Sequence, residues 1–378
     1  MKKLGVNIAV VVPFSKSVGG AFNYTEKLID ALSMLSQVSC INVVSINANM
    51  LYFNERYINN KKIVCTYYKK EIPIIRKSFE FINYYPGTNK SAINIINSLD
   101  PDIAICTAPW TDGFYTYVKK RIVIVHDLYH FNDCSKYDFI TEQRDRGKNT
   151  IDMCSKAEKI ICESAITKMK IQNLGLAFNF DSIKTTTLPL PPGFSLSDVD
   201  QDLKPTHLTP NDFWFAPSHI CAFKNQEVIL KAISLLKRNG IIQNVIFAFP
   251  SFSPAYLIKL IILAAKLNVL KNIKFMYKTP NKLMPYLYLN CQGVIMSSKM
   301  GPTNMPIVEA IEFGKPCLAT YESSAGYDSS YPITRFHSDD FEMLASKIAE
   351  SRGNSIKKMS PSPSEIFRDS LAKLFVYI

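Results

Sequence analysis

Apolar runs of a few residues alternate along this chain with longer segments in which apolar residues recur every three or four positions. The short runs predict buried strands and the longer segments predict helices. Such alternation is typical of a parallel sheet whose two faces are covered by helices. In the first half the predicted elements are strand 6–13, helix 20–36 and strands 40–47, 102–107, 121–125 and 159–162. In the second half they are strands 213–216, 244–249, 272–276, 293–297 and 316–320, and helices 225–238, 254–268, 280–289 and 305–313.

A proline-rich segment interrupts the alternation between the two halves. Residues 187–211 hold prolines, Gly193 and a run of Ser and Asp, which is typical of an interdomain linker. A chain of 378 residues is also long enough for two domains of ordinary size. We therefore predict an α/β protein with a first domain over 1–195 and a second over 196–355, followed by a C-terminal helix within 356–378.

Two apolar segments need to be distinguished from membrane or targeting signals. The start, residues 1–14, lacks a small-residue cleavage site and contains Asn7, so it predicts a first parallel strand rather than a signal peptide. Segment 256–267 has lysines seven residues apart, at Lys259 and Lys266. It predicts an amphipathic helix that is too short to span a bilayer. The sequence therefore predicts no transmembrane segment.

The formal charge is 44 − 32 = +12 at neutral pH, which favours anionic partners. Basic residues are dispersed and no nucleic-acid-binding motif is present, so nucleic acid is the least favoured of these. An anionic small substrate and peripheral contact with an anionic membrane remain. Nine scattered cysteines without a Cys-x-x-Cys pair predict a reducing, cytoplasmic location and no structural zinc.

The segment 301–320 is the most informative part of the chain, because it reads as a loop, a short helix, a turn and a buried strand. Thr303 or Asn304 is placed to cap the helix, Pro306 suits its first turn, and Gly314 marks its end. A strand, 293–297, precedes this loop. The unpaired N–H groups and positive dipole end of such a helix suit an anion such as a diphosphate.

Glu309 lies one turn inside this predicted helix. Helical side chains lean toward the N-terminus, so its carboxylate is placed to reach a ligand there. A carboxylate beside a phosphate site commonly accepts hydrogen bonds from a ribose diol. The alternative is an acid that only complements the helix dipole.

These residues resemble the donor-site segment of retaining, family-4-like glycosyltransferases, the group 1 glycosyltransferases. The resemblance rests on Gly-Pro-Thr-Asn-hydrophobic-Pro at the start and Glu-Ala-x-x-x-Gly-x-Pro at the end. It implies the GT-B fold, in which two Rossmann-like domains face each other across a cleft, the first (1–195) binding the acceptor and the second (196–355) the nucleotide sugar. It also implies that the C-terminal helix within 356–378 crosses back to the first domain; the alternative is a helix docked on its own domain. Many relatives carry a Glu-x7-Glu pair, but here Gly301 replaces the first acid, so backbone N–H groups of 302–305 would act in its place. The donor-binding residues implied in this segment are Gly301, Pro302, Thr303, Asn304, Met305 and Glu309.

Two further loops match the family pattern. After strand 213–216, resembling enzymes place a basic residue and a lysine five positions apart on the donor diphosphate. His219 and Lys224 occupy these positions, with His219 in place of the usual arginine. Gly19 and Gly20 open the first predicted helix and would face the donor phosphates. The alternative readings are a surface lysine, a loop histidine and an ordinary tight turn.

His126 and Asp127 follow the predicted strand 121–125, where α/β sheets place ligands. His126 resembles the cleft histidine of this superfamily, which implies contact with the donor sugar or the acceptor. The alternative is a histidine that holds a loop.

The resemblance implies a retaining hexosyltransferase that moves a sugar from a nucleotide-sugar donor to a saccharide or lipid-linked acceptor, with His126, Lys224 and Glu309 as its catalytic residues. It implies no cofactor and no essential metal. The branch of the family that the chain resembles, together with its basic surface, implies bacterial surface polysaccharide or lipopolysaccharide synthesis in the cytoplasm, with peripheral contact at the inner face of the cytoplasmic membrane. Two alternatives remain: another enzyme on this fold, such as a nucleotide-sugar epimerase or a phosphorylase, and a non-catalytic nucleotide-sugar-binding module.

Overall fold

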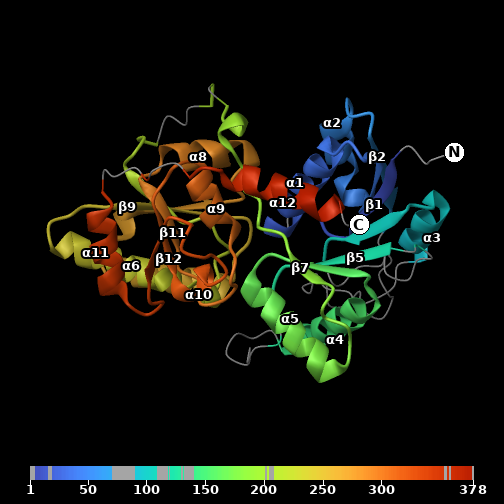
Figure 1. The fold of residues 1–378 in the computed structure, drawn as a ribbon. Coiled ribbons are helices and arrows are strands. Elements are labelled where there is room, and N and C mark those ends of the chain that lie inside the picture. The colour runs from blue at the N-terminus through green and yellow to red at the C-terminus, as the bar shows by residue number, and fades with distance from the viewer. Residues whose placement is uncertain are drawn as a thin grey trace. The chain divides into compact units, whose positions relative to one another are not determined.

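The computed structural model contains two compact α/β units, each built on its own parallel sheet (Figure 1). Unit 1 comprises Met1–Pro189 and Arg368–Ile378, and unit 2 comprises Leu190–Phe367. The structure describes residues 5–15, 19–69, 90–108, 118, 120–128, 131, 140–200, 202–203, 208–352, 356 and 359–376. The functional domain boundaries predicted at 195/196 and 355/356 stay predictions.

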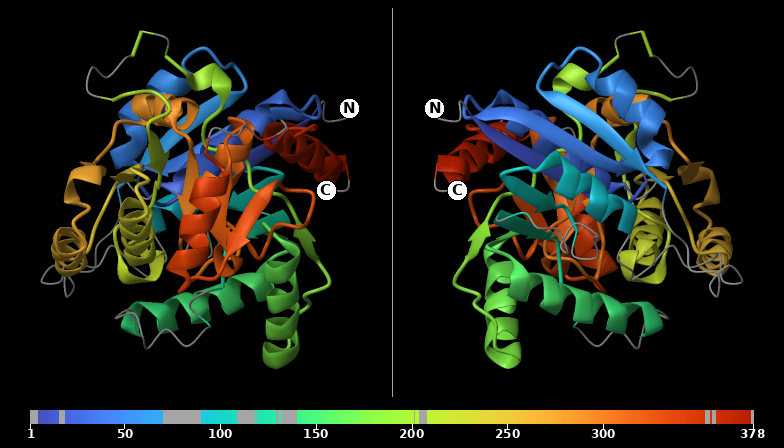
Figure 2. Two further views of the ribbon diagram at one scale, coloured as in Figure 1. Left: turned by 90° about the vertical axis from the view of Figure 1, so that its left-hand side faces the viewer. Right: turned by 90° about the vertical axis from the view of Figure 1, so that its right-hand side faces the viewer.

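Unit 1 holds a seven-stranded sheet in the order β3-β2-β1-β4-β5-β6-β7, with every neighbouring pair parallel. Its strands are β1 Val6–Val12, β2 Val38–Ile46, β3 Ile63–Tyr68, β4 Ile103–Cys106, β5 Lys120–Val125, β6 Lys159–Cys162 and β7 Thr185–Thr187. Its helices are α1 Gly20–Met34, α2 Met50–Tyr57, α3 Lys90–Leu99, α4 Ile140–Lys156 and α5 Ala165–Phe178. Both views in Figure 2 show α4 and α5 next to each other.

Unit 2 holds a six-stranded parallel sheet in the order β10-β9-β8-β11-β12-β13. Its strands are β8 Phe213–Phe215, β9 Asn244–Phe249, β10 Ile273–Tyr277, β11 Gly293–Met296, β12 Cys317–Thr320 and β13 Ile333–Phe336. Its helices are α6 Gln226–Arg238, α7 Pro254–Lys266, α8 Met284–Asn290, α9 Met305–Glu312, α10 Tyr321–Ser324 and α11 Phe341–Glu350.

Central strands are uniformly apolar because both of their faces are covered. In β1, the five residues Ile8 to Val12 are fully buried, and the strand pairs with β2 on one side and β4 on the other. In unit 2, α6, α7 and α11 pack on the same side of the sheet in one apolar core. Figure 1 shows α8 and α9 over the opposite face. This packing fixes the carboxyl ends of the strands, where the predicted site residues lie.

Local signals explain where several helices begin. The side chain of Ser164 accepts a hydrogen bond from the Thr167 N–H at the start of α5, at 3.2 Å. The side chain of Asp340 does the same for the Met343 N–H at the start of α11, at 2.8 Å. Pro254 occupies the first turn of α7. Such caps are each worth about 1 kcal/mol.

The last helix, α12, runs over Pro363–Val376, and its residues from Arg368 onward belong to unit 1. Its residues Leu371, Leu374 and Phe375 are buried. Of the predicted C-terminal segment, 357–358 and 377–378 lie outside the described residues. Among the helices that the structure describes, none is both long enough and apolar enough to span a bilayer.

Candidate functional site

Both sheets reverse their strand order at one point, between β1 and β4 in unit 1 and between β8 and β11 in unit 2. At such a point the loops after the two strands diverge, and open α/β sheets bind their ligands there. The site residues predicted from the sequence lie after β1 and β5 in unit 1, and after β8 and β11 in unit 2.

Lys224 lies beside the N-terminus of α9 in unit 2. It ends the 3-10 helix Ala222–Lys224, between β8 and α6. Its Nζ donates a hydrogen bond to Oδ1 of Asn304 at 3.1 Å. The two loops are also joined through their backbones, because Ser297 Oγ donates to the Lys224 carbonyl at 2.7 Å and the Lys299 N–H donates to the Phe223 carbonyl at 2.8 Å. The structure therefore brings together two of the predicted donor-binding residues, which are eighty positions apart in the sequence.

Asn304 occupies the N-cap position of α9, but its side chain makes no capping hydrogen bond. The predicted N-cap position of Asn304 is therefore confirmed, but its side chain does not form the capping hydrogen bond. Instead, Nδ2 of Asn304 donates to the carbonyls of Gly301 and Ser323, at 3.0 and 2.9 Å. These two bonds orient the buried amide so that its oxygen points at Lys224. Asn304 thus positions the lysine, which would otherwise be a flexible surface side chain.

The loop before α9 turns sharply at Gly301, whose φ of 86° is one that residues with a Cβ rarely adopt. The Pro302 carbonyl accepts a hydrogen bond from the Gly326 N–H at 2.8 Å. Pro302 and Thr303 are half-buried, and Met305 is buried at the start of the helix. The loop is thus held by backbone contacts next to Lys224.

His219 lies in the same loop as Lys224 and is neutral at neutral pH. Its Nδ1 is 2.5 Å from Oγ of Ser251. Burial, together with the charge of Lys224, lowers the pKa of His219 to about 4. The positive charge expected at this position is therefore absent, and contact between His219 and a donor stays a prediction.

Glu309 is buried in α9, and both of its carboxylate oxygens accept hydrogen bonds. Oε1 accepts from the Gly193 N–H at 3.1 Å, and Oε2 accepts from the hydroxyl of Tyr288. Burial and the Glu309 carboxylate raise the pKa of Tyr288, which keeps this hydroxyl protonated as a donor. Glu309 therefore fastens the start of unit 2 to the helix, and its contact with a ribose stays a prediction.

In unit 1, three polar groups lie side by side, each directly after a strand. His126 follows β5, Thr107 follows β4 and Glu163 follows β6, and these three strands are neighbours in the sheet. Nε2 of His126 donates to the Thr107 carbonyl at 2.8 Å, and Nδ1 lies 2.5 Å from Oε1 of Glu163. The ring of Tyr24 packs edge-on against the imidazole, with the centroids 5.0 Å apart.

The pairing with Glu163 determines the charge of His126. Burial alone lowers the pKa of this imidazole, but the charge of Glu163 and its hydrogen bond outweigh that effect and raise the pKa. A carbonyl only accepts, so Nε2 carries a proton, and the raised pKa favours a second proton on Nδ1. Both ring nitrogens are thus engaged within unit 1, as expected for a histidine that holds loops together. Direct contact of His126 with a sugar or an acceptor stays a prediction.

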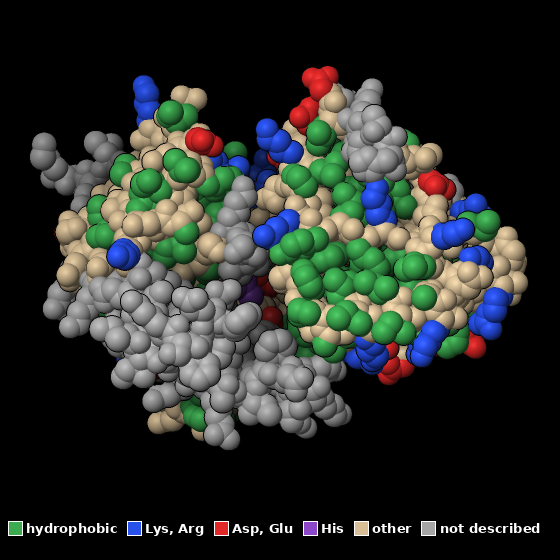
Figure 3. Space-filling model, turned by 180° about the vertical axis from the view of Figure 1, so that it is seen from behind, with side chains coloured by type: hydrophobic (Ala, Val, Ile, Leu, Met, Phe, Trp, Pro, Cys, Tyr) green, Lys and Arg blue, Asp and Glu red, His purple; other side chains and the backbone are tan. Residues whose placement is uncertain are grey.

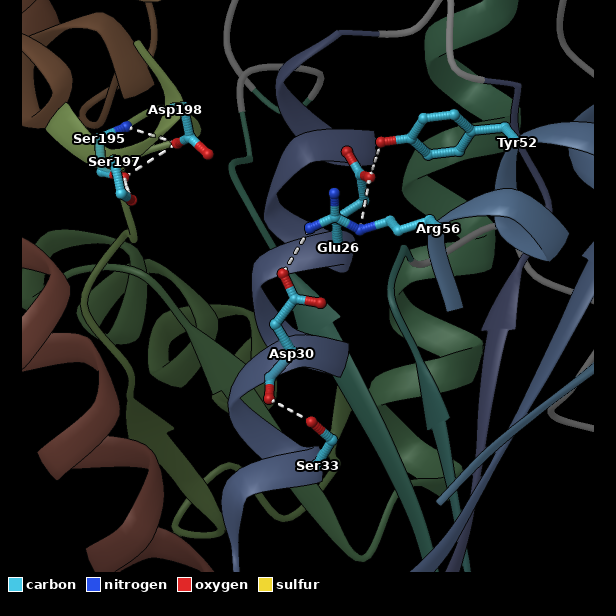
Figure 4. A network of polar contacts seen from close by, with 8 residues as sticks. All are labelled: Glu26, Asp30, Ser33, Tyr52, Arg56, Ser195, Ser197 and Asp198. Carbon is cyan, nitrogen blue, oxygen red and sulfur yellow. Dashed lines mark hydrogen bonds and ion pairs between the residues drawn. The ribbon is translucent and has the colours of Figure 1, made fainter. Parts of the chain in front are cut away.

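Gly19 and Gly20 open α1 in unit 1, close to the carboxyl end of β1. Gly19 is the N-cap residue, with φ of 73°, and a Cβ added at either glycine would meet open space. The helix is anchored to α2 by a network around Arg56 (Figure 4). Arg56 Nη2 contacts Asp30 Oδ2 at 2.6 Å and Arg56 Nε contacts Glu26 Oε1 at 3.3 Å. These contacts hold the helix and the exposed backbone at its start. Asp127 directly follows His126, and the resemblance implies that both bind the acceptor, which stays a prediction.

Sequence reasoning missed three residues of this arrangement, Glu163, Tyr288 and Gly193. Glu163 carried a signal, because it directly follows the predicted strand 159–162 just as His126 follows 121–125. Gly193 is 116 positions from Glu309, and no sequence pattern connects them.

A model of the family of group 1 glycosyl transferases matches residues 212–327, which include the loops of Lys224 and Asn304. A search of curated protein sequences gives no match. Solved structures resemble the whole chain. HepE of Anabaena in complex with UDP-glucose is 13% identical, with a TM-score of 0.70 and 98% of each chain covered. The sucrose-phosphate synthase of Thermosynechococcus elongatus is 13% identical, with a TM-score of 0.64, 98% of this chain and 95% of that chain covered.

The lipopolysaccharide outer core galactosyltransferase WaaB, in its apo form, is 11% identical with a TM-score of 0.59, and the alignment covers 98% of this chain and 100% of that chain. Identities this low show a common fold. Together with the family match, they confirm the resemblance to group 1 glycosyltransferases that the 301–320 segment predicted. Residues 212–327 therefore carry the group 1 glycosyl transferase segment, and the chain as a whole has the GT-B fold.

Proposed function

We propose that this chain is a retaining glycosyltransferase that moves a hexose from a nucleotide-diphosphate sugar to a saccharide or lipid-linked acceptor. The observation that carries this proposal is the 3.1 Å contact of Lys224 with Asn304 at the N-terminus of α9, beside the point where the strand order of unit 2 reverses. Two comparisons support it. HepE structures contain UDP-glucose, or UDP with glucose, and WaaB is a lipopolysaccharide galactosyltransferase. A role in bacterial surface polysaccharide or lipopolysaccharide synthesis is part of the proposal.

Lys224 and the N-terminus of α9 would act on the donor diphosphate. When the glycosidic bond breaks, the leaving nucleoside diphosphate gains negative charge, and a fixed cation stabilises that charge selectively. The positive end of the α9 dipole adds to the same field. The backbone N–H groups of 303–305 would donate hydrogen bonds to the phosphates, since Pro302 has none. This arrangement supplies a positive charge without an essential metal ion, which is the chemistry we propose.

The remaining residues would bind the rest of the substrates. Glu309 would accept bonds from the ribose with its remaining lone pairs, since a carboxylate has about four acceptor sites. His219 would donate one hydrogen bond as a neutral imidazole. In unit 1, Gly19 and Gly20 would offer backbone to the phosphates, and His126 with Asp127 would bind the acceptor or the sugar. Front-side attack would then keep the anomeric configuration.

A donor screen tests the proposal. Purified protein is titrated calorimetrically with UDP-glucose, UDP-galactose, GDP-mannose and ADP-glucose, and nucleotide release is measured for each. We expect one nucleotide to be bound clearly more tightly than the others, with slow hydrolysis of its sugar in the absence of acceptor. A protein that binds no nucleotide sugar would contradict the proposal. Binding without any turnover would favour the non-catalytic module instead.

The stereochemical part of the proposal needs its own measurement. Once a donor and an acceptor are found, the anomeric configuration of the product is read by NMR. An α-linked donor sugar should give an α-linked product. An inverted product would contradict the retaining mechanism but leave the donor site in place.

A further inference from the structure

Helix α7 of unit 2 has apolar side chains on both of its faces. Eleven of its thirteen residues are apolar, and the exceptions are Lys259 and Lys266. The inner face packs on the core of the unit through Tyr256, Leu260 and Ala264, which are buried. An isolated amphipathic helix would have polar residues opposite these three. Here the sequence departs from that rule, so the outer face needs an explanation.

The outer face carries a stripe of isoleucines that are open to solvent. Ile258, Ile261 and Ile262 are 58%, 40% and 50% exposed, and their spacing of three and four residues places them together on the helix surface. The sequence predicted an amphipathic helix with the lysines marking its polar face, whereas the exposed face is mostly apolar. Figure 3 shows a broad hydrophobic area on unit 2, with Lys and Arg side chains and a few Asp or Glu side chains at its border. Contiguous apolar surface of this kind marks an interaction site.

Basic residues predominate in the segment that contains this stripe. From Val228 to Val308 the chain contains nine lysines and Arg238 but no Asp or Glu. This segment includes α6 from Val228 onward, with β9, α7, β10, α8 and β11. Lys259 of α7 is paired with Glu227 of α6 at 2.8 Å, so one acid does lie beside the stripe. Lys266 and Lys271 are exposed near the end of α7. The apolar stripe therefore has an excess of basic side chains near it.

We propose that the outer face of α7, the stripe Ile258, Ile261 and Ile262, docks on an anionic membrane surface. The isoleucines would enter the boundary between headgroups and acyl chains, and the lysines would contact anionic headgroups. Long lysine side chains suit this position because their stems pack on apolar surface while the ammonium stays in water. The same basic surface argues against a second copy as the occupant, since two such faces would bring like charges together.

This proposal does not depend on the glycosyltransferase activity, and vesicle flotation tests it. The full chain is mixed with vesicles of phosphatidylcholine alone, or of phosphatidylcholine with phosphatidylglycerol. We expect binding to the anionic vesicles only, weakening as salt is raised because the lysine contacts are screened. Equal binding to neutral vesicles, or no binding to either kind, would overturn the proposal.

Paired variants locate the docking surface. Ile258→Ser with Ile262→Ser should lower vesicle binding by about tenfold or more, because the apolar part of the contact is lost. Lys266→Glu with Lys271→Glu should lower it by a similar factor on anionic vesicles. The matched control is Leu176→Ser with Ile183→Ser, which removes two apolar residues of unit 1 that are 85% and 89% exposed. The control should bind as the unmodified chain does.

Circular dichroism and thermal unfolding of each variant must match the unmodified chain, so that loss of binding is not loss of fold. Analytical ultracentrifugation tests the alternative that a second copy of the chain covers the stripe. If the unmodified chain is a dimer and the double isoleucine variant is a monomer, the stripe is an interface between copies and the membrane proposal fails. If the isoleucine variant floats as well as the unmodified chain, the proposal fails as well.

Discussion

The two units share a strand order but differ in how they hold charge at the carboxyl edge of the sheet. In unit 1, the side chain at this edge is His126, which is paired with the carboxylate of Glu163. In unit 2 it is Lys224, and the group that positions it is the neutral amide of Asn304. An ion pair cancels most of its own field, whereas an amide orients a cation and leaves its charge in place. The same scaffold thus holds an ion pair in one unit and, in the other, a cation positioned by an amide at the proposed anion site.

Replacing Lys224 with alanine should have the largest effect. The cation would be lost while Asn304 keeps its bonds to Gly301 and Ser323, so the fold should survive. We expect turnover of the nucleotide sugar to fall about 100-fold, since a charged hydrogen bond to a phosphate is worth up to about 3 kcal/mol. Steady-state kinetics and calorimetric titration measure this. Lys231→Ala, which removes an exposed lysine of α6, is the control and should change neither value.

Removing the charge of Glu163 should break its ion pair with His126 in unit 1. Because the folded-state pKa of His126 is raised, the pair stabilises the fold fully below the unfolded pKa of about 6.5 and less as pH rises through the folded pKa. Glu163→Gln should therefore lower the free energy of unfolding by about 1–3 kcal/mol near pH 6 and by less at alkaline pH. Urea unfolding at several pH values measures it.

A matched control comes from the same sheet. Glu158 contacts Arg121 at 3.1 Å but is 41% exposed, so Glu158→Gln should cost less than about 1 kcal/mol. If Glu163→Gln lowers the free energy of unfolding by no more than Glu158→Gln does, and the pH dependence of stability is unchanged, then the pair of Glu163 with His126 does not stabilise unit 1.

The pH dependence of nucleotide-sugar affinity tests whether His219 of unit 2 lies next to the donor diphosphate. Its pKa is about 4 without ligand, and a nearby diphosphate would raise it. The complex would then take up a proton, so the affinity for UDP-glucose should increase a few-fold as pH falls from about 8 to about 5. His219→Asn should remove this slope, which calorimetry at each pH detects. An unchanged slope in the variant would place His219 away from the phosphates.

The smallest effects concern the adjacent glycines of α1. Gly19 has φ of 73°, so Gly19→Ala should cost about 1 kcal/mol in free energy of unfolding. Gly20 is helical with open space around it, so Gly20→Ala should be neutral or stabilise by up to about 1 kcal/mol. Chemical denaturation compares the two. If the two substitutions change the free energy of unfolding equally, the positive φ of Gly19 does not cause backbone strain in the alanine variant.

Elements with a strong apolar pattern could be predicted from the sequence. Strand 244–249 coincides with β9, and helix 305–313 differs from α9 by one residue. The edge strand β3 and the helix before it, α2, could not be predicted from the sequence. Strand β3 is only partly buried along its length, and α2 exposes Met50 and Leu51, so neither shows a clean period. Both lie in the 50–100 region where the sequence pattern gave no assignment.

Residue pairs of the site were harder to predict than its single residues. The family resemblance of two separate loops assigned both Lys224 and Asn304 to donor binding, and each loop follows a predicted strand. It could not give the partner of His126, since that depends on β6 lying next to β5 in the sheet. The pairing of Glu309 with Gly193 depends on how the linker folds back, which composition does not encode.

The backbone at Gly301 limits which residues this position accepts. With φ at 86°, a residue with a side chain would strain the turn that leads into α9 by about 1–3 kcal/mol. A Cβ added there would make only ordinary van der Waals contacts, at 3.8 Å. Glycine is therefore favoured by the conformation of the turn and not by a lack of room, so a substitution here would act on the entry to α9 without crowding its neighbours.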